Sequence, residues 1–247
     1  MWNQLLADDR VERDDLASIQ LAVSGAAKLD PSVAEAIHDR LGIDIREGYG
    51  LTETCGIVST AMNCDAPLGS VGQVFPGVAV RLVDQEGDDV LIGDTGEVLV
   101  NGDVVSPGYW NDPEATERTR TADGWLKTGD VALVDEHGFL AIVDRLKDLI
   151  IVSGFNVHPI EIETVLSADP TVALAGVVGE PDSLTGERPV AFVVPADGAA
   201  PDPDALRNRC IQQLARYKVP KRVEIVDAIP TTAVGKIRRR DLGQRGG

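Results

Sequence analysis

The densest set of side chains that could do chemistry lies in one short segment with closely spaced glycines, an aromatic ring, hydroxyls and a carboxylate. Its members are Gly48, Tyr49, Gly50, Leu51, Thr52, Glu53 and Thr54. Glycine lets a backbone approach a ligand closely, and a tyrosine ring offers a flat face for stacking. The Glu53 carboxylate is a hard oxygen ligand of the kind that Mg²⁺ takes. A Gly-Tyr-Gly segment alone is more often only a turn, so the spacing leaves both interpretations open.

A second glycine turn follows a neighbouring apolar run. Residues 19–23 are a short apolar stretch that predicts a buried strand, and Ser24, Gly25 and Ala26 close it. Parallel strands of an α/β sheet end at a common edge, where such sheets bind ligands. We therefore expect this turn and the Gly-Tyr-Gly segment to open at the same edge.

Two further loops carry single charges suited to a nucleotide. In the segment 125–130, Asp130 follows a Gly turn and could accept the hydroxyls of a ribose, although an aspartate that merely ends a strand is commoner. In the segment 230–236, Lys236 sits on a loop of small residues and could serve a phosphate as a mobile point charge. The alternative is a solvated lysine, because arginines at 238–240 make this end of the chain locally basic.

The stretch 144–163 joins two differently patterned regions. It opens with charged residues, continues as an apolar run at 149–152, breaks at Ser153-Gly154 and restarts at Pro159 with a helical pattern. Exposed polar backbone rearranges at little cost, so this joint predicts a pivot. The alternative is an ordinary surface loop.

The composition sets the outer limits. A chain of 247 residues with 43% hydrophobic residues can form one large or two medium domains. Its net charge of -17 argues against nonspecific binding to nucleic acid, which needs a positive surface. The 3 cysteines lack metal-ligand spacing, which favours a reduced, cytoplasmic protein. No apolar run is long enough for a transmembrane segment, and the acidic first residues are unlike a signal peptide.

The predicted elements indicate an α/β and α+β fold in three parts. Residues 1–68 alternate strand and helix like the end of a large α/β domain, with a helix that Asp30 and Pro31 begin and Gly42 ends, followed by a strand at 43–46. Residues 69–144 have the short alternating runs of a small antiparallel barrel or sandwich. Residues 145–247 read as a compact α+β domain, with the hinge at 144–148. In it we expect a helix from 159, strands at 173–178, 189–194 and 222–226, and a helix over 203–217.

Taken in order, these stretches resemble the adenylate-forming superfamily, and within it most closely the fatty acyl-CoA synthetases. The resemblance covers essentially the whole chain. It rests on Tyr-Gly-Leu-Thr-Glu-Thr, Thr-Gly-Asp, Asp-Arg-Leu-Lys-Asp and Pro-Thr-x-x-x-Gly-Lys at these mutual distances. In that family, ATP and a carboxylic acid give acyl-AMP and pyrophosphate, and a thiol, usually of coenzyme A, then displaces AMP.

The resemblance implies roles for the residues of the first part. Tyr49 would stack on adenine, with Gly25 and Ala26 along the other side of the base. Thr52 would touch the phosphate and Glu53 would hold Mg²⁺. The remaining positions implied to line the ATP/AMP site are Ser24, Gly48 and Gly50.

It also implies roles for the later motifs. Asp130 would bind the ribose hydroxyls with help from Arg145. Lys236 would neutralise charge developing between the carboxylate oxygen and the α-phosphate. Lys147 would be the hinge about which the last domain rotates, as a mobile lid. Ser153 and Gly154 would line the tunnel for the pantetheine arm of coenzyme A, because glycine leaves room for a slim thiol.

The sequence departs from the family pattern in two ways. Ala26 stands where many relatives have a second glycine, which could shift the adenine turn. No Gly-rich run with Ser, Thr and Lys occurs before Gly48, so the family's phosphate-gripping loop and its front half are absent. We therefore expect the C-terminal half of a ligase, weak or inactive alone.

Two alternatives remain open. One is a noncatalytic module that binds AMP or coenzyme A, or docks onto a partner supplying the missing N-terminal half. The other is an adenylating enzyme for an amino or aromatic acid, or one with a carrier-protein thiol as acceptor. The apolar run at 55–58 favours an aliphatic, fatty acid substrate.

Overall fold

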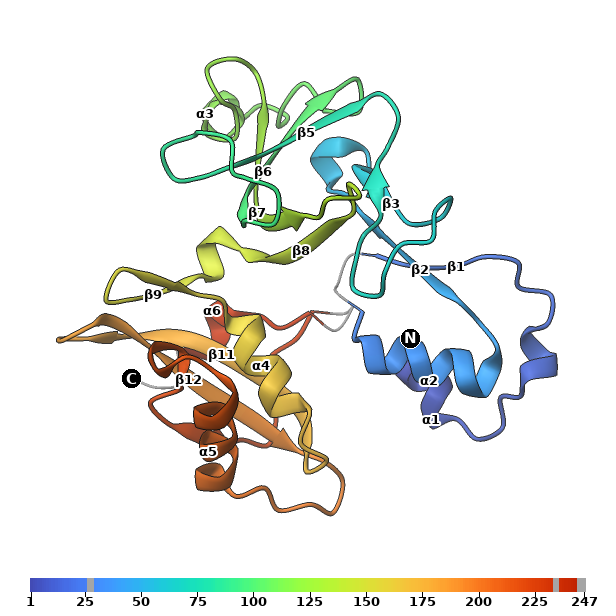
Figure 1. Cartoon of the computed structure of the whole chain (residues 1–247), viewed down its shortest axis with the longest axis vertical. Coiled ribbons are helices and arrows are strands. Elements are labelled where there is room, and N and C mark those ends of the chain that lie inside the picture. Colours follow the sequence, from blue (N-terminus) through green and yellow to red (C-terminus); the bar gives the residue numbers. More distant parts are fainter. Residues whose placement is uncertain (26–28, 233–235, 244–247) are drawn as a thin grey trace. The chain divides into compact units, whose positions relative to one another are not determined.

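A computed structural model describes residues 1–25, 29–232 and 236–243 of the chain (Figure 1). The chain divides into two compact units, Met1–Val143 and Asp144–Gly247. Each unit has its own hydrophobic core. Within the described ranges, no helix is both long and apolar enough to cross a membrane.

The first unit begins with helical segments around a small parallel strand pair. Its first elements are α1 (Trp2–Ala7), η1 (Arg13–Leu16), β1 (Ala22–Ser24), α2 (Pro31–Leu41) and β2 (Ile45–Tyr49). The Asp30 side chain caps α2 by accepting the Ser32 N–H at 2.9 Å, and Gly42 ends the helix in the left-handed conformation. The start and end predicted for this helix are confirmed.

The strand expected at 43–46 begins and ends later than predicted. It runs as β2 from Ile45 to Tyr49 because it has partners on both sides. Its first part pairs in parallel with β1, where Ser24 lies opposite Glu47. Its last residues pair antiparallel with β3 (Ser59–Thr60), which in turn pairs with β4 (Gln73–Val74).

A second sheet completes the first unit. Its strands are β5 (Val78–Val83), β6 (Gly96–Gly102), β7 (Leu126–Val134) and β8 (Leu140–Arg145), and α3 (Pro113–Arg118) lies between β6 and β7 in sequence. The strand order is β5-β6-β7-β8. Alternate residues such as Val98, Val100 and Leu126 are buried on one face. The antiparallel β-structure expected here is confirmed, in the form of an open sheet rather than a closed barrel.

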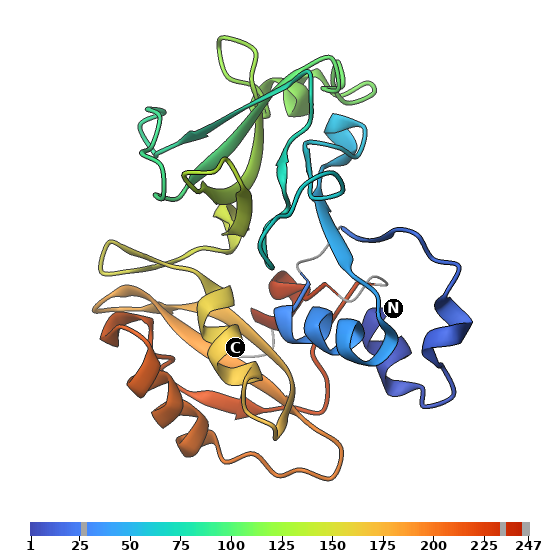
Figure 2. The same cartoon turned by 45° about the vertical axis from the view of Figure 1, so that its right-hand side comes forward.

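The second unit is built on one five-stranded sheet. It contains η3 (Leu146–Asp148), β9 (Ile150–Val152), β10 (Phe155–Val157), α4 (Pro159–Ser167), β11 (Val172–Asp182), β12 (Gly186–Pro195), α5 (Pro203–Gln213), η4 (Arg216–Lys218), β13 (Val223–Ile225) and α6 (Arg239–Leu242). The order is β10-β9-β12-β11, with β13 parallel to β12. Figure 2 shows α4 and α5 lying against this sheet.

Apolar side chains that alternate along the strands form a core on each face of this sheet. Val177 belongs to the core that α4 and α5 cover, whereas the next residue, Val178, packs with Leu242 of α6. The α+β part of the fold is therefore confirmed. The helix expected over 203–217 was wrong at its end, because the backbone becomes extended at Leu214, whose side chain packs into the core.

Candidate functional site

The ends of β1 and β2 bring two predicted site segments together. Ser24 lies beside Glu47 in the parallel register. A Cβ added at Gly25 would lie 3.5 Å from the carbonyl oxygen of Gly48. The two turns therefore open at one sheet edge, within van der Waals distance of each other. Ala26 lies outside the described residues.

Gly50 starts a tight loop that presents Thr52 and Glu53. A Cβ at Gly50 would come within 2.3 Å of the Gly56 carbonyl, so only glycine fits there without backbone movement. The segment between them forms η2 (Thr52–Thr54), and the Gly56 N–H donates to the Leu51 carbonyl at 2.8 Å. Thr52 is exposed as a result, and Glu53 is half-buried.

Glu53 has a partner that sequence reasoning missed. The hydroxyl of Tyr109 donates to Glu53 Oε1 at 2.6 Å, and this bond is the main cause of a raised pKa of Tyr109. The backbone N–H of Ser106 also donates to the Glu53 carbonyl at 2.8 Å. The available signal was an aromatic residue directly after a loop glycine, Gly108, which is weak on its own.

The residues around Glu53 suit a metal held largely by its substrate. Among the described residues, no group of three or more His, Cys, Asp or Glu side chains could hold a metal ion. Glu53 is a single half-buried carboxylate with the exposed hydroxyl of Thr52 nearby in sequence. Mg²⁺ is commonly bound by one or two carboxylates together with phosphates and water. The donor set therefore fits Mg²⁺ bound to a nucleotide.

Asp130 lies beside a bulge in the pairing of β6 and β7. Pairing between β6 and β7 shifts register between Glu97 and Leu99, and Gly129 has a φ of 69°. The Gly129 N–H donates to the Glu97 side chain at 3.1 Å. The bulge buries Asp130 to 3% exposure, where its Oδ2 accepts the hydroxyl of Tyr49 at 2.7 Å. Thus the two motifs proposed for adenine and ribose are in direct contact.

The joint between the two patterned regions contains one short exposed helix. Arg145 is the last residue of β8, and its N–H donates to the side chain of the buried Asp144 at 2.8 Å. Lys147 lies in η3 and is exposed. The boundary between the two units falls directly before Asp144, three positions from Lys147. This position is suited to a hinge, since β8 ends at Arg145 and only the three-residue η3 lies between it and β9.

Ser153 and Gly154 form the two-residue turn between β9 and β10. Val152 pairs with Phe155 across the turn. Ser153 has a φ of 51° and Gly154 a φ of 83°, the positive values that such hairpin turns require. Both residues are exposed. The chain break predicted at these positions is thus a sharp turn between two strands.

Lys236 lies on a loop whose two sides are held together. Its N–H donates to the Thr232 hydroxyl at 3.1 Å, and its carbonyl accepts the Thr232 N–H at 2.8 Å. Thr231 and Ile237 form an isolated bridge just beyond. Lys236 is half-buried. Lys236 is therefore tied to Thr232 by two hydrogen bonds.

Sequence reasoning also missed a buried ion pair close to Lys236 in sequence. Arg239 donates to both carboxylate oxygens of Glu163, at 2.9 and 2.7 Å, and to Asp148 at 3.3 Å. Glu163 is only 5% exposed, and burial raises its pKa. One guanidinium thus connects α6, α4 and η3.

The predicted site residues fall into two groups, one in each unit. The first unit holds Ser24, Gly25, Gly48, Tyr49, Gly50, Thr52, Glu53 and Asp130, and the second holds Arg145, Lys147, Ser153, Gly154 and Lys236.

Comparison with known families matches both units. The family of AMP-binding enzymes matches residues 1–110, and the C-terminal domain of AMP-binding enzymes matches residues 161–236. The chain belongs to the AMP-binding enzyme family. The matched regions contain all the predicted site residues except those in the segment between them, namely Asp130, Arg145, Lys147, Ser153 and Gly154.

Individual AMP-binding enzymes are similar over nearly the whole chain. A long-chain-fatty-acid–CoA ligase of Haemophilus influenzae is 41% identical over 98% of the chain, which spans 43% of that protein. A feruloyl-CoA synthase of Amycolatopsis is 40% identical over 100% of the chain, which spans 50% of that protein. The crystal structure of ATP-bound MatB from Rhodopseudomonas palustris superposes with a TM-score of 0.94 at 34% identity, over 99% of the chain and 49% of MatB. The chain therefore spans about half the length of these relatives.

Proposed function

We propose that these residues are the C-terminal part of an ATP-dependent fatty acyl-CoA ligase. The observation that carries the proposal is the contact between Tyr49 and Asp130 at the sheet edge where Gly25 and Gly48 meet. That arrangement offers an aromatic face, a carboxylate and two open glycine turns to one nucleotide. The similarity to a long-chain-fatty-acid–CoA ligase supports a fatty acid as the substrate.

In the first half-reaction a carboxylate oxygen attacks the α-phosphorus of ATP. The bond from that phosphorus to the bridging oxygen breaks, and pyrophosphate leaves with the electron pair. Lys236 places a positive charge where negative charge develops between the two reactants. Thr52 offers its exposed hydroxyl to a phosphate, and Glu53 would hold the Mg²⁺ that neutralises the phosphate charge.

In the second half-reaction the coenzyme A sulfur attacks the carbonyl carbon of acyl-AMP. The bond between that carbon and the phosphate oxygen breaks, AMP leaves with the electron pair, and the thiol proton passes to water. The exposed Ser153-Gly154 turn would line the path of the pantetheine arm, since Gly154 has open space where a Cβ would stand. Arg145 would assist Asp130 at the ribose.

We assign the pivot between these steps to residues 144–148, with Lys147 as the hinge residue. Residues 1–68 would belong to the large nucleotide-binding domain, 69–144 to a small β-subdomain, and 145–247 to a mobile lid. The support is that the first unit ends at Val143 and that the next helical segment, η3, is short and exposed. A reduced, cytoplasmic setting agrees with the unpaired state of Cys55, Cys64 and Cys210.

The assignment of Lys236 is tested in a complete ligase that contains these residues. Lys236→Ala should lower ATP–pyrophosphate exchange by about 100-fold, because one electrostatic contact in a transition state is worth that much. The same variant should still convert supplied acyl-AMP and coenzyme A into thioester. Normal exchange in Lys236→Ala would remove the lysine from the mechanism. Arg240→Ala, an exposed cation four positions later, is the matched control.

The 247-residue chain alone should adenylate fatty acids very slowly or not at all. The motifs found here supply only part of the contacts to ATP, and positioning accounts for much of an enzyme's rate. Acyl-CoA formation by the purified chain at the rate of a complete ligase would contradict this expectation.

Two other functions remain as alternatives. A noncatalytic AMP- or CoA-binding module would bind one of these ligands in calorimetry yet support neither half-reaction, even when a separate N-terminal half is added. The second alternative is an enzyme for another acid, and the 40% identity to a feruloyl-CoA synthase supports it. Pyrophosphate exchange with palmitate, ferulate and amino acids, and thioester formation with coenzyme A or a carrier protein, would distinguish these substrates.

A further inference from the structure

The tip of the β11–β12 hairpin holds the Ser153-Gly154 turn from one side. The Ser153 N–H donates to the Thr185 carbonyl at 2.8 Å. Gly186 pairs with Val152, the residue before the turn. One position earlier, the Ile151 N–H donates to Glu187 Oε2 at 2.8 Å. One turn is thus attached to another through three successive residues.

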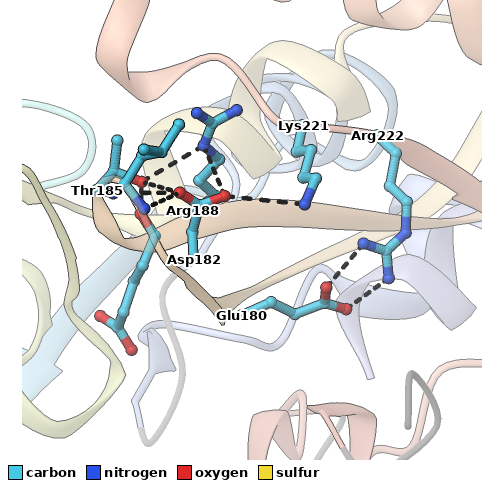
Figure 3. Close-up of polar contacts among 8 residues, drawn as sticks. Glu180, Asp182, Thr185, Arg188, Lys221 and Arg222 are labelled. Atoms are coloured by element: carbon cyan, nitrogen blue, oxygen red, sulfur yellow. Dashed lines mark hydrogen bonds and ion pairs between the residues drawn. The ribbon is translucent and has the colours of Figure 1, made fainter.

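Asp182 organises the second of these turns. Its Oδ1 accepts the N–H groups of Leu184 and Thr185 at 3.0 and 3.1 Å and the Thr185 hydroxyl at 3.0 Å. Its Oδ2 pairs with Arg188 Nε at 3.0 Å and with Lys221 Nζ at 3.8 Å (Figure 3). The Asp182 side chain is only 12% exposed. A single carboxylate therefore orders the residues that reach Ser153.

The Ser153 turn needs this external support. Ser153 has a φ of 51°, in the left-handed region that residues other than glycine seldom occupy. Such conformations persist only where the surroundings hold them. The hydrogen bond from Ser153 to Thr185 is one such constraint, and it depends on a carbonyl whose residue Asp182 holds at two points.

We propose that Asp182 is a positioning residue for the thioester-forming half-reaction, acting through Thr185 on the Ser153-Gly154 turn. The inference rests on the proposed function, in which that turn lines the path of the pantetheine arm. The hydrogen bonds and ion pairs found for Asp182 in the described residues lie within the β11–β12 hairpin or reach Lys221. Its loss should therefore affect the attack of the thiol and spare adenylation.

The same strand provides a matched control. Glu180 lies two positions before Asp182 on β11 and is 23% exposed. Its carboxylate accepts two hydrogen bonds from Arg222, at 2.7 and 2.5 Å, and Figure 3 shows this pair apart from the Asp182 turn. Glu180→Ala removes a well-paired carboxylate from β11 without removing an acceptor from residues 184 and 185.

The experiment compares Asp182→Ala, Asp182→Asn and Glu180→Ala in a complete ligase that carries these residues. ATP–pyrophosphate exchange reports the first half-reaction, and thioester formation from supplied acyl-AMP and coenzyme A reports the second. Asp182→Ala should slow thioester formation by about 10- to 100-fold, since small misplacements cost that much. Exchange should stay within about twofold of wild type. Asp182→Asn keeps an oxygen acceptor for the turn and should recover most of the rate, and Glu180→Ala should change neither reaction.

A mechanical readout accompanies the kinetics. Hydrogen exchange at the Ser153 amide should speed up in Asp182→Ala and not in Glu180→Ala. Only the Asp182 variant removes hydrogen bonds from Thr185, whose carbonyl accepts the Ser153 N–H. Equal losses in both half-reactions, or unchanged thioester formation, would overturn the inference. A wild-type ligase that makes no acyl-adenylate would instead overturn the proposed function, while exchange at Ser153 would still decide whether Asp182 holds the turn.

Discussion

The hydroxyl of Tyr49 donates a 2.7 Å hydrogen bond to Asp130, a residue 81 positions later in the chain. Tyr49 is the last residue of β2 in the first sheet, and Asp130 lies within β7 of the second sheet. Asp130 is 3% exposed, so this bond satisfies a carboxylate that little water reaches. The contact joins the two sheets of the first unit at its candidate nucleotide site.

Replacing Tyr49 by Phe should separate stacking from this tether. The ring that would stack on adenine stays, but the buried Asp130 carboxylate loses a donor. The free energy of unfolding should fall by about 1–3 kcal/mol, the usual cost of removing one partner from a buried hydrogen bond, and the KM for ATP of a complete ligase should rise. Urea denaturation and steady-state kinetics measure the two effects. Tyr217→Phe, on an exposed ring stacked against Phe155, should have neither effect.

Removing one partner of the Glu163–Arg239 pair should cost more than removing both. Arg239→Leu leaves a carboxylate that is 5% exposed, and we expect about 3–5 kcal/mol lower stability. Glu163→Leu combined with Arg239→Leu should be more stable than either single variant, because apolar side chains can fill the same space. Denaturant midpoints of the four proteins test this. Strictly additive losses would show that the buried charges do not depend on one another.

His158 should make stability depend on pH. Burial is the main effect and lowers the pKa of His158. The negative charges of Asp144 and Glu161 raise this pKa in part, and the positive charge of Lys218 lowers it. The unfolded chain, with a pKa of about 6.5, therefore takes up the proton before the folded chain does. The stabilising contribution is complete above that pH and is lost as the pH falls towards the folded pKa.

The measurement is the urea midpoint between pH 7.5 and pH 5.5 for wild type and His158→Gln. The variant should lose less stability on acidification than wild type does, because it lacks the imidazole whose pKa burial lowers. Identical slopes in wild type and His158→Gln would mean that His158 does not contribute.

Lys147→Pro tests the pivot in a complete ligase. Proline fixes φ at about −65°, so a segment that must adopt two backbone conformations could keep only one. The variant should spare at most one half-reaction, as measured by pyrophosphate exchange and by thioester formation. Lys147→Ala removes the charge without fixing φ and should leave both rates near wild type. Full rates for both reactions in Lys147→Pro would rule out the hinge.

Local features were predictable because their causes lie within a few residues. Asp30, Pro31 and Gly42 determine where α2 begins and ends through contacts inside the helix itself. Gly154 marks the turn after β9 because its missing side chain permits the positive φ of 83° there. Boundaries that depend on partners were less accurate. β2 extends to Tyr49 because β3 pairs with its end, and α5 stops at Gln213 because Leu214 packs into the core.

The sequence by itself determined the order and type of the chemical groups: the glycine turns, Glu53, Asp130, the charged joint and Lys236. Only the tertiary structure decided which of them meet and what supports them. The hydrogen bonds of Tyr109 to Glu53, of Arg239 to Glu163 and of Ser153 to Thr185 all join residues more than 25 positions apart. Such contacts follow from strand pairing and burial, which close long stretches of chain, and no local preference encodes them.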